Sequence, residues 1–257
     1  MSRVCSVYLR RRSFIVYCYG EIIMTNIVLA FIISIIVSYF IGCTPSAYLV
    51  GRAFKGVDIR QVGSHNMGAM NVFYTIGFWP GMLVLASDII KGMLALYLSY
   101  LIATLLFQVP SAYVIPVEMA AGVAVIAGHN FPVFLKFKGG KGGATAIGVL
   151  AFLLAWVMWI DVGGVKIPIP WGCVIYLASF LLLMLITRWP TFSYGISFIA
   201  FPLLAWFAYH DPGLTIYSVC IALVPILMYI PRIKQILGKS GGSFKRAIFR
   251  KNLKDRM

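Results

Sequence analysis

The chain has 257 residues, of which 61% are hydrophobic and only 11% are charged, with a mean hydropathy of +0.92. Soluble domains carry about 25% charged residues, so this composition excludes a cytosolic enzyme, a disordered chain and a secreted disulfide scaffold. Lys and Arg total 22 against 7 Asp and Glu, a formal net charge of +15. In an apolar chain, cytoplasmic basic loops and attraction to anionic lipid or phosphate explain this excess better than nucleic acid does.

Long segments without a charged side chain predict an all-α fold, a polytopic integral membrane bundle of about seven transmembrane helices. Each is near the roughly 20 apolar residues that a helix needs to cross the hydrocarbon core. The second begins near Phe78, because Gly81 to Phe107 is apolar apart from Asp88 and Lys91. The charge-free segments are Ile22–Gly51, Gly92–Val117, Met119–Leu135, Gly142–Ile160, Ile167–Thr187, Trp189–His210 and Pro212–Pro231.

The basic residues predict an N-outside, C-inside orientation. Sixteen of them fall on one side of the membrane, nine of these in the tail from Arg232 to Arg256, and five fall on the other. This asymmetry places the richer side in the cytoplasm. Four discordant arginines precede the first helix, and a natural start at Met24 would remove them. We therefore expect an N-terminal extension at 1–23, a seven-helix membrane domain at 24–231 and a basic cytoplasmic tail at 232–257.

The loop after the first predicted helix, Gly63 to Asn71, reads GSHNMGAMN. Glycines such as Gly63 and Gly68 let the backbone approach a ligand, and side chains such as Ser64, Asn66 and Asn71 offer directional hydrogen bonds. The pattern favours a binding loop. The alternative is a solvated turn rich in turn-forming residues.

A second loop, Gly128 to Thr145, reads GHNFPVFLKFKGGKGGAT. Glycines surround Lys141, and a helix is predicted to start after them, which is typical of an anion cradle. It is not a Walker A loop, because Leu135 stands where that pattern needs glycine. A basic loop contacting lipid head groups is the alternative, and it suits Lys136 and Lys138.

Asp88 and Lys91 lie three residues apart inside the second predicted helix, and so on one face. Charges inside a membrane are costly and indicate function by default, with a structural ion pair as the alternative. His129 is a candidate base or a local helix cap, and Arg188 a candidate phosphate ligand or an anchor. The five scattered cysteines form no CxxC pair, and no HExxH motif occurs. Chemistry based on positioning and anion binding fits best, with no metal or organic cofactor.

Together with GCTPSAYLVGR (Gly42 to Arg52), these motifs resemble the bacterial membrane glycerol-3-phosphate acyltransferases of the PlsY type, from about Ile22 to Leu237. The resemblance implies seven membrane helices at the cytoplasmic membrane and an active site facing the cytoplasm. It implies transfer of an acyl chain from acyl phosphate to the 1-hydroxyl of sn-glycerol 3-phosphate, giving lysophosphatidic acid and phosphate. The expected partners are these two substrates and membrane lipids.

The resemblance also implies a set of site residues, with Asp88 as a structural ion-pair or site residue. The expected catalytic residues are Ser64, Asn66, Asn71, His129 and Lys141. The expected substrate-binding and phosphate-binding residues are Gly63, His65, Gly68, Lys91, Asn130, Gly139, Gly140, Gly142, Thr145 and Arg188.

Two departures from the family pattern stand out. Phe73-Tyr74 follows the Asn-Val pair where the family usually has an arginine, and Gly238-Lys239-Ser240 stands where its tail normally has Gly-Thr-Glu. Two other hypotheses are therefore kept. One is a transporter or binding protein for a phosphorylated or anionic solute, which predicts broken helices repeated in two halves, although no internal repeat is seen. The other is an inactive homologue that binds lipid phosphate.

Overall fold

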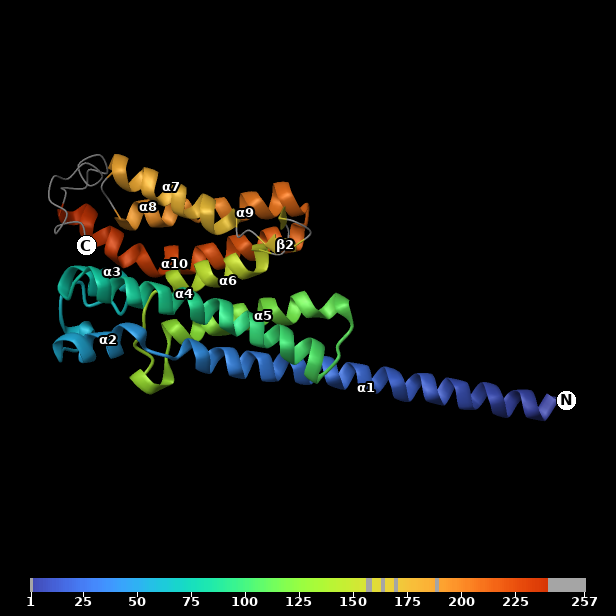
Figure 1. Cartoon of the computed structure of the whole chain (residues 1–257). Coiled ribbons are helices and arrows are strands. Elements are labelled where there is room, and N and C mark those ends of the chain that lie inside the picture. The colour runs from blue at the N-terminus through green and yellow to red at the C-terminus, as the bar shows by residue number, and fades with distance from the viewer. Residues whose placement is uncertain (1, 156–158, 163–164, 169–170, 188–189, 240–257) are drawn as a thin grey trace.

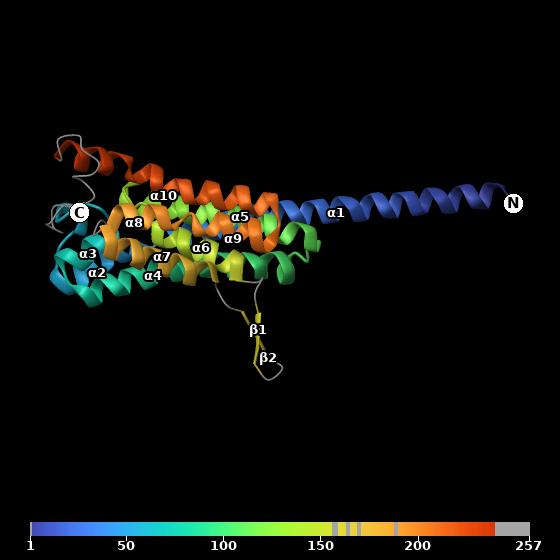
Figure 2. The ribbon, with the colours of Figure 1, turned by 90° about the horizontal axis from the view of Figure 1, so that it is seen from above.

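The computed structural model describes residues 2–155, 159–162, 165–168, 171–187 and 190–239. Within them, the chain is a bundle of helices that run side by side along one long axis, and the start of α1 projects beyond the others (Figures 1 and 2). The first half contains α1 (Ser2–Gly42), α2 (Ser46–Lys55), η1 (Ile59–Gln61), α3 (Ala69–Thr75), α4 (Phe78–Leu101), η2 (Ile102–Leu106), α5 (Ser111–Asn130) and η3 (Val133–Leu135). The second half contains α6 (Gly143–Ala155), β1 (Trp159–Val162), β2 (Val165–Pro168), α7 (Trp171–Thr187), α8 (Pro190–Ser197), α9 (Ala200–Leu204), η4 (Ala205–Tyr209) and α10 (Pro212–Lys239).

The surface of this bundle is apolar, which confirms an integral membrane protein. Large hydrophobic side chains such as Trp79, Leu105 and Leu185 are 70–78% exposed, a surface that lipid covers and water does not. By length and composition, four described helical segments can cross a membrane: Glu21–Lys55, Phe78–Leu106, Ser111–Leu135 and Pro212–Ile230. Three shorter apolar segments accompany them: Gly143–Leu154, Val174–Thr187 and Phe192–Ala208. Whether all seven span the membrane stays a prediction.

The first predicted span is split in the structure. The segment Ile22–Gly51 was expected to be one helix, but α1 ends at Gly42 and α2 begins at Ser46. Pro45 explains the break, because the residue before a proline is disfavoured in the helical region and proline has no N–H to donate. Arg52 and Lys55, expected in the loop, therefore belong to α2, which ends at the left-handed Gly56.

The second predicted span begins at Phe78 in the structure, as expected, but the charged residues placed its end wrongly. Glu118 separates two charge-free segments in the sequence, but it lies buried inside α5, and the chain leaves the preceding helix at Phe107 instead. A charge gap locates an apolar segment, but it does not locate a turn. The break instead coincides with Pro110, which immediately precedes α5.

Three later predicted segments also differ from the structure. Gly142–Ile160 was expected as a single helix, but α6 ends at Ala155 and Trp159–Val162 pairs antiparallel with Val165–Pro168. Because Val162 pairs with Val165 across a Gly-Gly dipeptide, the sequence there is that of a two-residue hairpin. This hairpin projects from the bundle in Figure 2 and is the exception to an otherwise all-helical fold among the described residues.

The sixth predicted span, Trp189–His210, is divided into α8, α9 and η4. Pro202 lies four residues after Phe198 and cannot donate to its carbonyl, which explains why the helix breaks at 198–199. The predicted tail also differs, because α10 continues beyond Pro231 to Lys239.

Glycines bring two pairs of helices into backbone contact next to the polar loops. A Cβ added to Gly42 of α1 would lie 2.1 Å from the Val125 carbonyl oxygen of α5, and one added to Gly128 of α5 would lie 2.1 Å from the Tyr39 carbonyl oxygen of α1. A Cβ on Gly148 of α6 would likewise lie 2.1 Å from the backbone of α4. Small residues permit such close crossings in membrane bundles. The helix ends that carry the polar loops are therefore held at fixed spacing.

Candidate active site

The first polar loop is organised by Asn71, the buried third residue of α3. Its side-chain oxygen accepts a hydrogen bond from the Ser64 backbone N–H at 2.9 Å, and its side-chain nitrogen donates to the carbonyl oxygens of Ile59, Val62 and Asn66 at 2.9–3.0 Å. A Cβ on Gly63 would lie 2.2 Å from Asn71 Oδ1, so only glycine fits against this amide. Three carbonyl oxygens share the two N–H donors of this amide, which makes Asn71 the residue that shapes the loop.

An ion pair fixes the start of the same loop. Asp58 caps η1 by accepting from the Arg60 backbone N–H, and its carboxylate pairs with the Arg60 guanidinium at 2.7 Å. That guanidinium holds the pKa of the Asp58 carboxyl below its usual value. Arg60 and Arg52 also lie over the ring of Tyr48, at 5.3 Å and 5.5 Å from its centroid. Both arginines therefore contact side chains of the protein itself, Arg52 the Tyr48 ring and Arg60 both that ring and Asp58.

Asp88 and Lys91 form the buried centre beneath the loops, which confirms that they share a face of α4. Lys91 Nζ donates to Asp88 Oδ1 at 2.6 Å, with side chains 7% and 3% exposed. Ser46 Oγ of α2 donates to the same oxygen at 2.8 Å, and His129 Nδ1 of α5 lies 3.6 Å from it. Three helices thus converge on one carboxylate.

The second loop folds back onto the end of α5. The Gly139 and Gly140 N–H groups donate to the carbonyl oxygens of Asn130 and His129, both at 3.1 Å. A Cβ on Gly140 would lie 2.1 Å from His129 Nε2 and 2.6 Å from the Met67 carbonyl oxygen of the first loop. The two polar loops, which are far apart in sequence, therefore meet at Gly140, with His129 between Gly140 and Asp88.

Lys141 follows this junction and contacts α10. Its ammonium lies 3.8 Å from the centroid of the Tyr229 ring, a cation–π contact that the sequence did not predict. The neighbouring Gly142 has φ +77° and a Cβ there would lie 2.6 Å from Asn130 Oδ1, so glycine is needed for both reasons. Lys141 thus stands just before the N-terminus of α6.

Of the remaining predicted site residues, some are buried near the Asp88–Lys91 pair and others are exposed in the loops. Thr145 is fully buried in the first turn of α6, and Ser64, Asn66 and Gly68 are partly exposed in the first loop. His65 is exposed with φ +58°, and its Nδ1 contacts the Arg60 carbonyl oxygen. Lys136 and Lys138 are exposed, as expected for a basic loop at the membrane surface. Arg188 lies outside the described residues.

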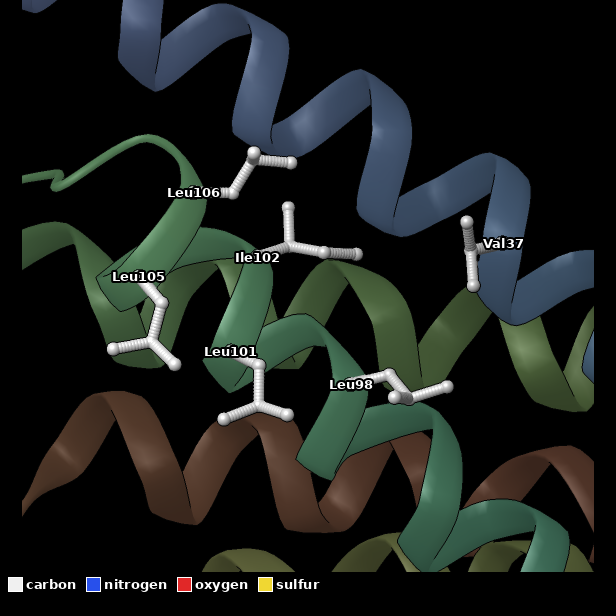
Figure 3. Close-up of a pocket in the computed structure, with 6 residues that line it drawn as sticks. All are labelled: Val37, Leu98, Leu101, Ile102, Leu105 and Leu106. Carbon is white, nitrogen blue, oxygen red and sulfur yellow. The ribbon is translucent and has the colours of Figure 1, made fainter.

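An apolar groove opens on the same face of α4 as the buried ion pair. It has a volume of about 380 Å³, and Figure 3 shows its lining side chains on α1, α4 and η2. Leu98 and Ile102 lie 7 and 11 residues after Lys91, so helical periodicity puts them on the stripe that carries Lys91. The groove residues are Val37, Leu98, Leu101, Ile102, Leu105 and Leu106.

The apolar bundle and its buried polar centre are those of an integral membrane protein with a site at one end of its helices. A family model described as glycerol-3-phosphate acyltransferase matches residues 32–239, and the chain belongs to this family. The chain is 53% identical over 233 residues to glycerol-3-phosphate acyltransferase 2 of Dehalococcoides mccartyi, covering 90% of this chain and all of that protein. It is 35% identical to the glycerol-3-phosphate acyltransferase of Fusobacterium nucleatum, over 84% of this chain and all of that one.

Two solved structures have the same fold. Both are of PlsY (YgiH), an integral membrane glycerol 3-phosphate acyltransferase, one in its glycerol 3-phosphate form and one in its lysophosphatidic acid form. The first is 28% identical with a TM-score of 0.65, covering 81% of this chain and 92% of that one. The second is 26% identical with a TM-score of 0.64, covering 86% and 99%.

Proposed function

We propose that this protein transfers an acyl chain from acyl phosphate to the 1-hydroxyl of sn-glycerol 3-phosphate, forming lysophosphatidic acid and inorganic phosphate. The observation that carries this proposal is the junction of the two polar loops at Gly140, above the buried Asp88–Lys91 pair and next to Lys141. Membership of the glycerol-3-phosphate acyltransferase family supports the acceptor. An activated donor is favoured because the hydroxyl that the structure pairs with a carboxylate, Ser46 with Asp88, is buried, and that carboxylate is already paired with Lys91.

The reaction needs positioning more than it needs a protein base. The oxygen of the 1-hydroxyl attacks the acyl carbonyl carbon, the bond from that carbon to the phosphate oxygen breaks, and the phosphate departs with its electron pair. The hydroxyl proton passes to a phosphate oxygen of the substrates. Acyl phosphate is a mixed anhydride, so no covalent acyl-enzyme is required, and the protein supplies alignment and charge stabilisation.

The position of each site residue suits it to a different role in this reaction. Lys141 and the N-terminus of α6 hold a phosphate, because a helix N-terminus and an ammonium both attract anions. Ser64 and Asn66, partly exposed in the first loop, orient the acyl phosphate and the oxyanion that develops. Asn71 has no N–H donor left for a phosphate and instead shapes the loop. Arg188 is a second phosphate cation in this proposal.

The acyl chain of the donor extends along the groove on α4. Leu98 lies two helical turns, about 10 Å, beyond Lys91 on the same stripe of the helix. A chain whose phosphate lies near the loop junction therefore meets this groove as it enters the membrane. The groove lining is entirely aliphatic, as an acyl chain requires.

The active site faces the cytoplasm in this proposal. Both loops, the end of α2 and the C-terminal end of α10 lie at one end of the bundle, and the N-terminus of α1 lies beyond the other (Figure 1). Six basic residues of the two loop regions gather at that end: Arg52, Lys55, Arg60, Lys136, Lys138 and Lys141. Basic residues remain on the cytoplasmic side of membrane proteins.

The test is transfer by the purified protein. Incubation with acyl phosphate and radiolabelled glycerol 3-phosphate should give labelled lysophosphatidic acid, and Lys141→Ala should abolish it. Lys138→Ala, which removes an exposed lysine from the same loop, is the matched control and should keep most of the activity. Binding of glycerol 3-phosphate without product would contradict the proposal and favour a binding protein, and near-normal turnover of a folded Lys141→Ala variant would contradict the role of Lys141.

A further inference from the structure

Two buried hydroxyls without a partner lie at the start of α6. They are Thr145 Oγ1 and the Tyr194 hydroxyl, and neither makes a hydrogen bond within the described part of the chain. Buried polar groups are almost always hydrogen-bonded, so each orphan needs an explanation. Two unpartnered hydroxyls at one helix N-terminus indicate a ligand that accepts hydrogen bonds from them.

Tyr194 is the member that sequence patterns did not predict. It lies on α8, and its ring packs edge-on against Phe198 at 5.1 Å and Tyr176 at 6.3 Å and tilted against Tyr229 at 5.7 Å. A Cβ added to Gly143 would lie 1.1 Å from the Tyr194 hydroxyl oxygen and 2.1 Å from the ring carbon that bears it. The hydroxyl therefore occupies the space where any side chain at Gly143 would stand.

This placement puts a hydrogen-bond donor at a helix N-terminus. Gly143 is the first residue of α6, a helix of 13 residues, and the N–H groups of its first turn have no partner within the helix. Thr145, in that same turn, is 0% exposed and its hydroxyl is also unpartnered. Lys141 precedes the turn, and the Tyr229 ring beneath its ammonium also packs on Tyr194.

We infer that Tyr194 is a phosphate-binding residue, whose hydroxyl donates a hydrogen bond to a phosphate oxygen held at the N-terminus of α6. The inference rests on the proposed function and adds a ligand from α8 to it. Phosphate fits the surroundings because backbone N–H groups, two hydroxyls and an ammonium converge there, and all of them donate. Packing alone needs the aromatic ring of Tyr194 but does not need its hydroxyl.

The phosphate has two sources, the donor and the acceptor, and kinetics separates them. Tyr194→Phe keeps the ring and removes the hydroxyl. The loss of a hydrogen bond to a charged group should raise the KM or dissociation constant of the phosphate compound bound there by about 10- to 150-fold. If the donor phosphate binds at α6, the KM for acyl phosphate and the inhibition constant of inorganic phosphate rise together. If the acceptor binds there, the KM for glycerol 3-phosphate rises instead.

A direct measurement of phosphate binding tests the role of Tyr194 independently of whether the protein catalyses acyl transfer. Calorimetric titration of the wild type and Tyr194→Phe with inorganic phosphate and with glycerol 3-phosphate measures affinity even if no transfer occurs. If the wild type shows no transfer but Tyr194→Phe binds phosphate more weakly than the wild type, the proposed reaction is wrong and the phosphate site stands. An active wild type with all constants unchanged in Tyr194→Phe would overturn the role of Tyr194 and leave the reaction standing.

Two further variants guard against a merely structural effect. Tyr217→Phe removes another buried tyrosine hydroxyl, one that donates to the Met119 carbonyl oxygen away from the loops, and should leave all the constants unchanged. Gly143→Ala must displace the Tyr194 hydroxyl, so it should raise the KM and the dissociation constant of the same phosphate compound that Tyr194→Phe affects. A rise in Tyr217→Phe equal to that in Tyr194→Phe, or normal affinity in Gly143→Ala, would refute the inference.

Discussion

Replacing Asp88 by Asn tests whether the buried centre is held together by charge. The substitution keeps the shape of the side chain and leaves an oxygen that can accept from Ser46, but it removes the anion that Lys91 contacts at 2.6 Å. With both side chains at most 7% exposed, Lys91 would then be an unpaired buried cation. Breaking a buried pair in this way costs about 3–5 kcal/mol. We expect Asp88→Asn to lower the free energy of unfolding by that amount.

The double variant Asp88→Asn/Lys91→Met distinguishes charge from shape. With both charges gone, no ion is left uncompensated, and most of the loss should be recovered, to within about 1–2 kcal/mol of the wild type. The measurement is the free energy of unfolding from titration with dodecyl sulfate in mixed micelles. Asp211→Asn is the control, because this exposed residue caps α10 and Asn caps equally well. A double variant whose loss equals the sum of the two single losses would refute the reasoning.

Three other outcomes follow from the site and its orientation. A cysteine placed in Ser64–Asn71 of a cysteine-free variant should react with an impermeant reagent only from the cytoplasmic side, and labelling of intact cells would invert the topology. Tyr74→Arg should lower the KM for glycerol 3-phosphate with little change in kcat, because a guanidinium adds a bidentate phosphate contact. An unchanged KM in a folded variant would show that Tyr74 does not face the phosphate. Leu101→Trp should shift the donor preference toward shorter acyl chains, whereas Leu185→Trp, on an exposed surface, should not.

The features that the sequence could predict are those set by local composition. Apolar segments long enough for helices predict a membrane bundle, because the bilayer penalises every charge and every unpaired backbone group. Asp88 and Lys91 could be paired from their spacing alone, since a helix brings residues three apart together. The two polar loops were recognisable because glycine recurs at short spacing in both, next to asparagine in the first and lysine in the second.

The features that sequence could not predict depend on contacts between distant elements. Tyr194 and Tyr229 lie in apolar segments where an aromatic residue is unremarkable, and only the folded chain brings Tyr194 next to Gly143 and Tyr229 next to Lys141. Asn71 resembled a ligand for substrate because an amide offers both donors and acceptors. In the folded chain, three carbonyl groups and one N–H of the same loop use those groups instead.

The arrangement of charge explains why a neutral pair lies beneath a cationic loop. Asp88 and Lys91 cancel each other, so they contribute hydrogen bonds and rigidity to the junction without adding net charge there. In the proposed function, the attraction for phosphate comes from Lys141 and the N-terminus of α6. Close crossings at Gly42, Gly128 and Gly148 fix the helices that carry these groups. Groups held in place this way can stabilise charge in a transition state without having to reorganise, which is what the proposed reaction, one without a protein nucleophile, requires.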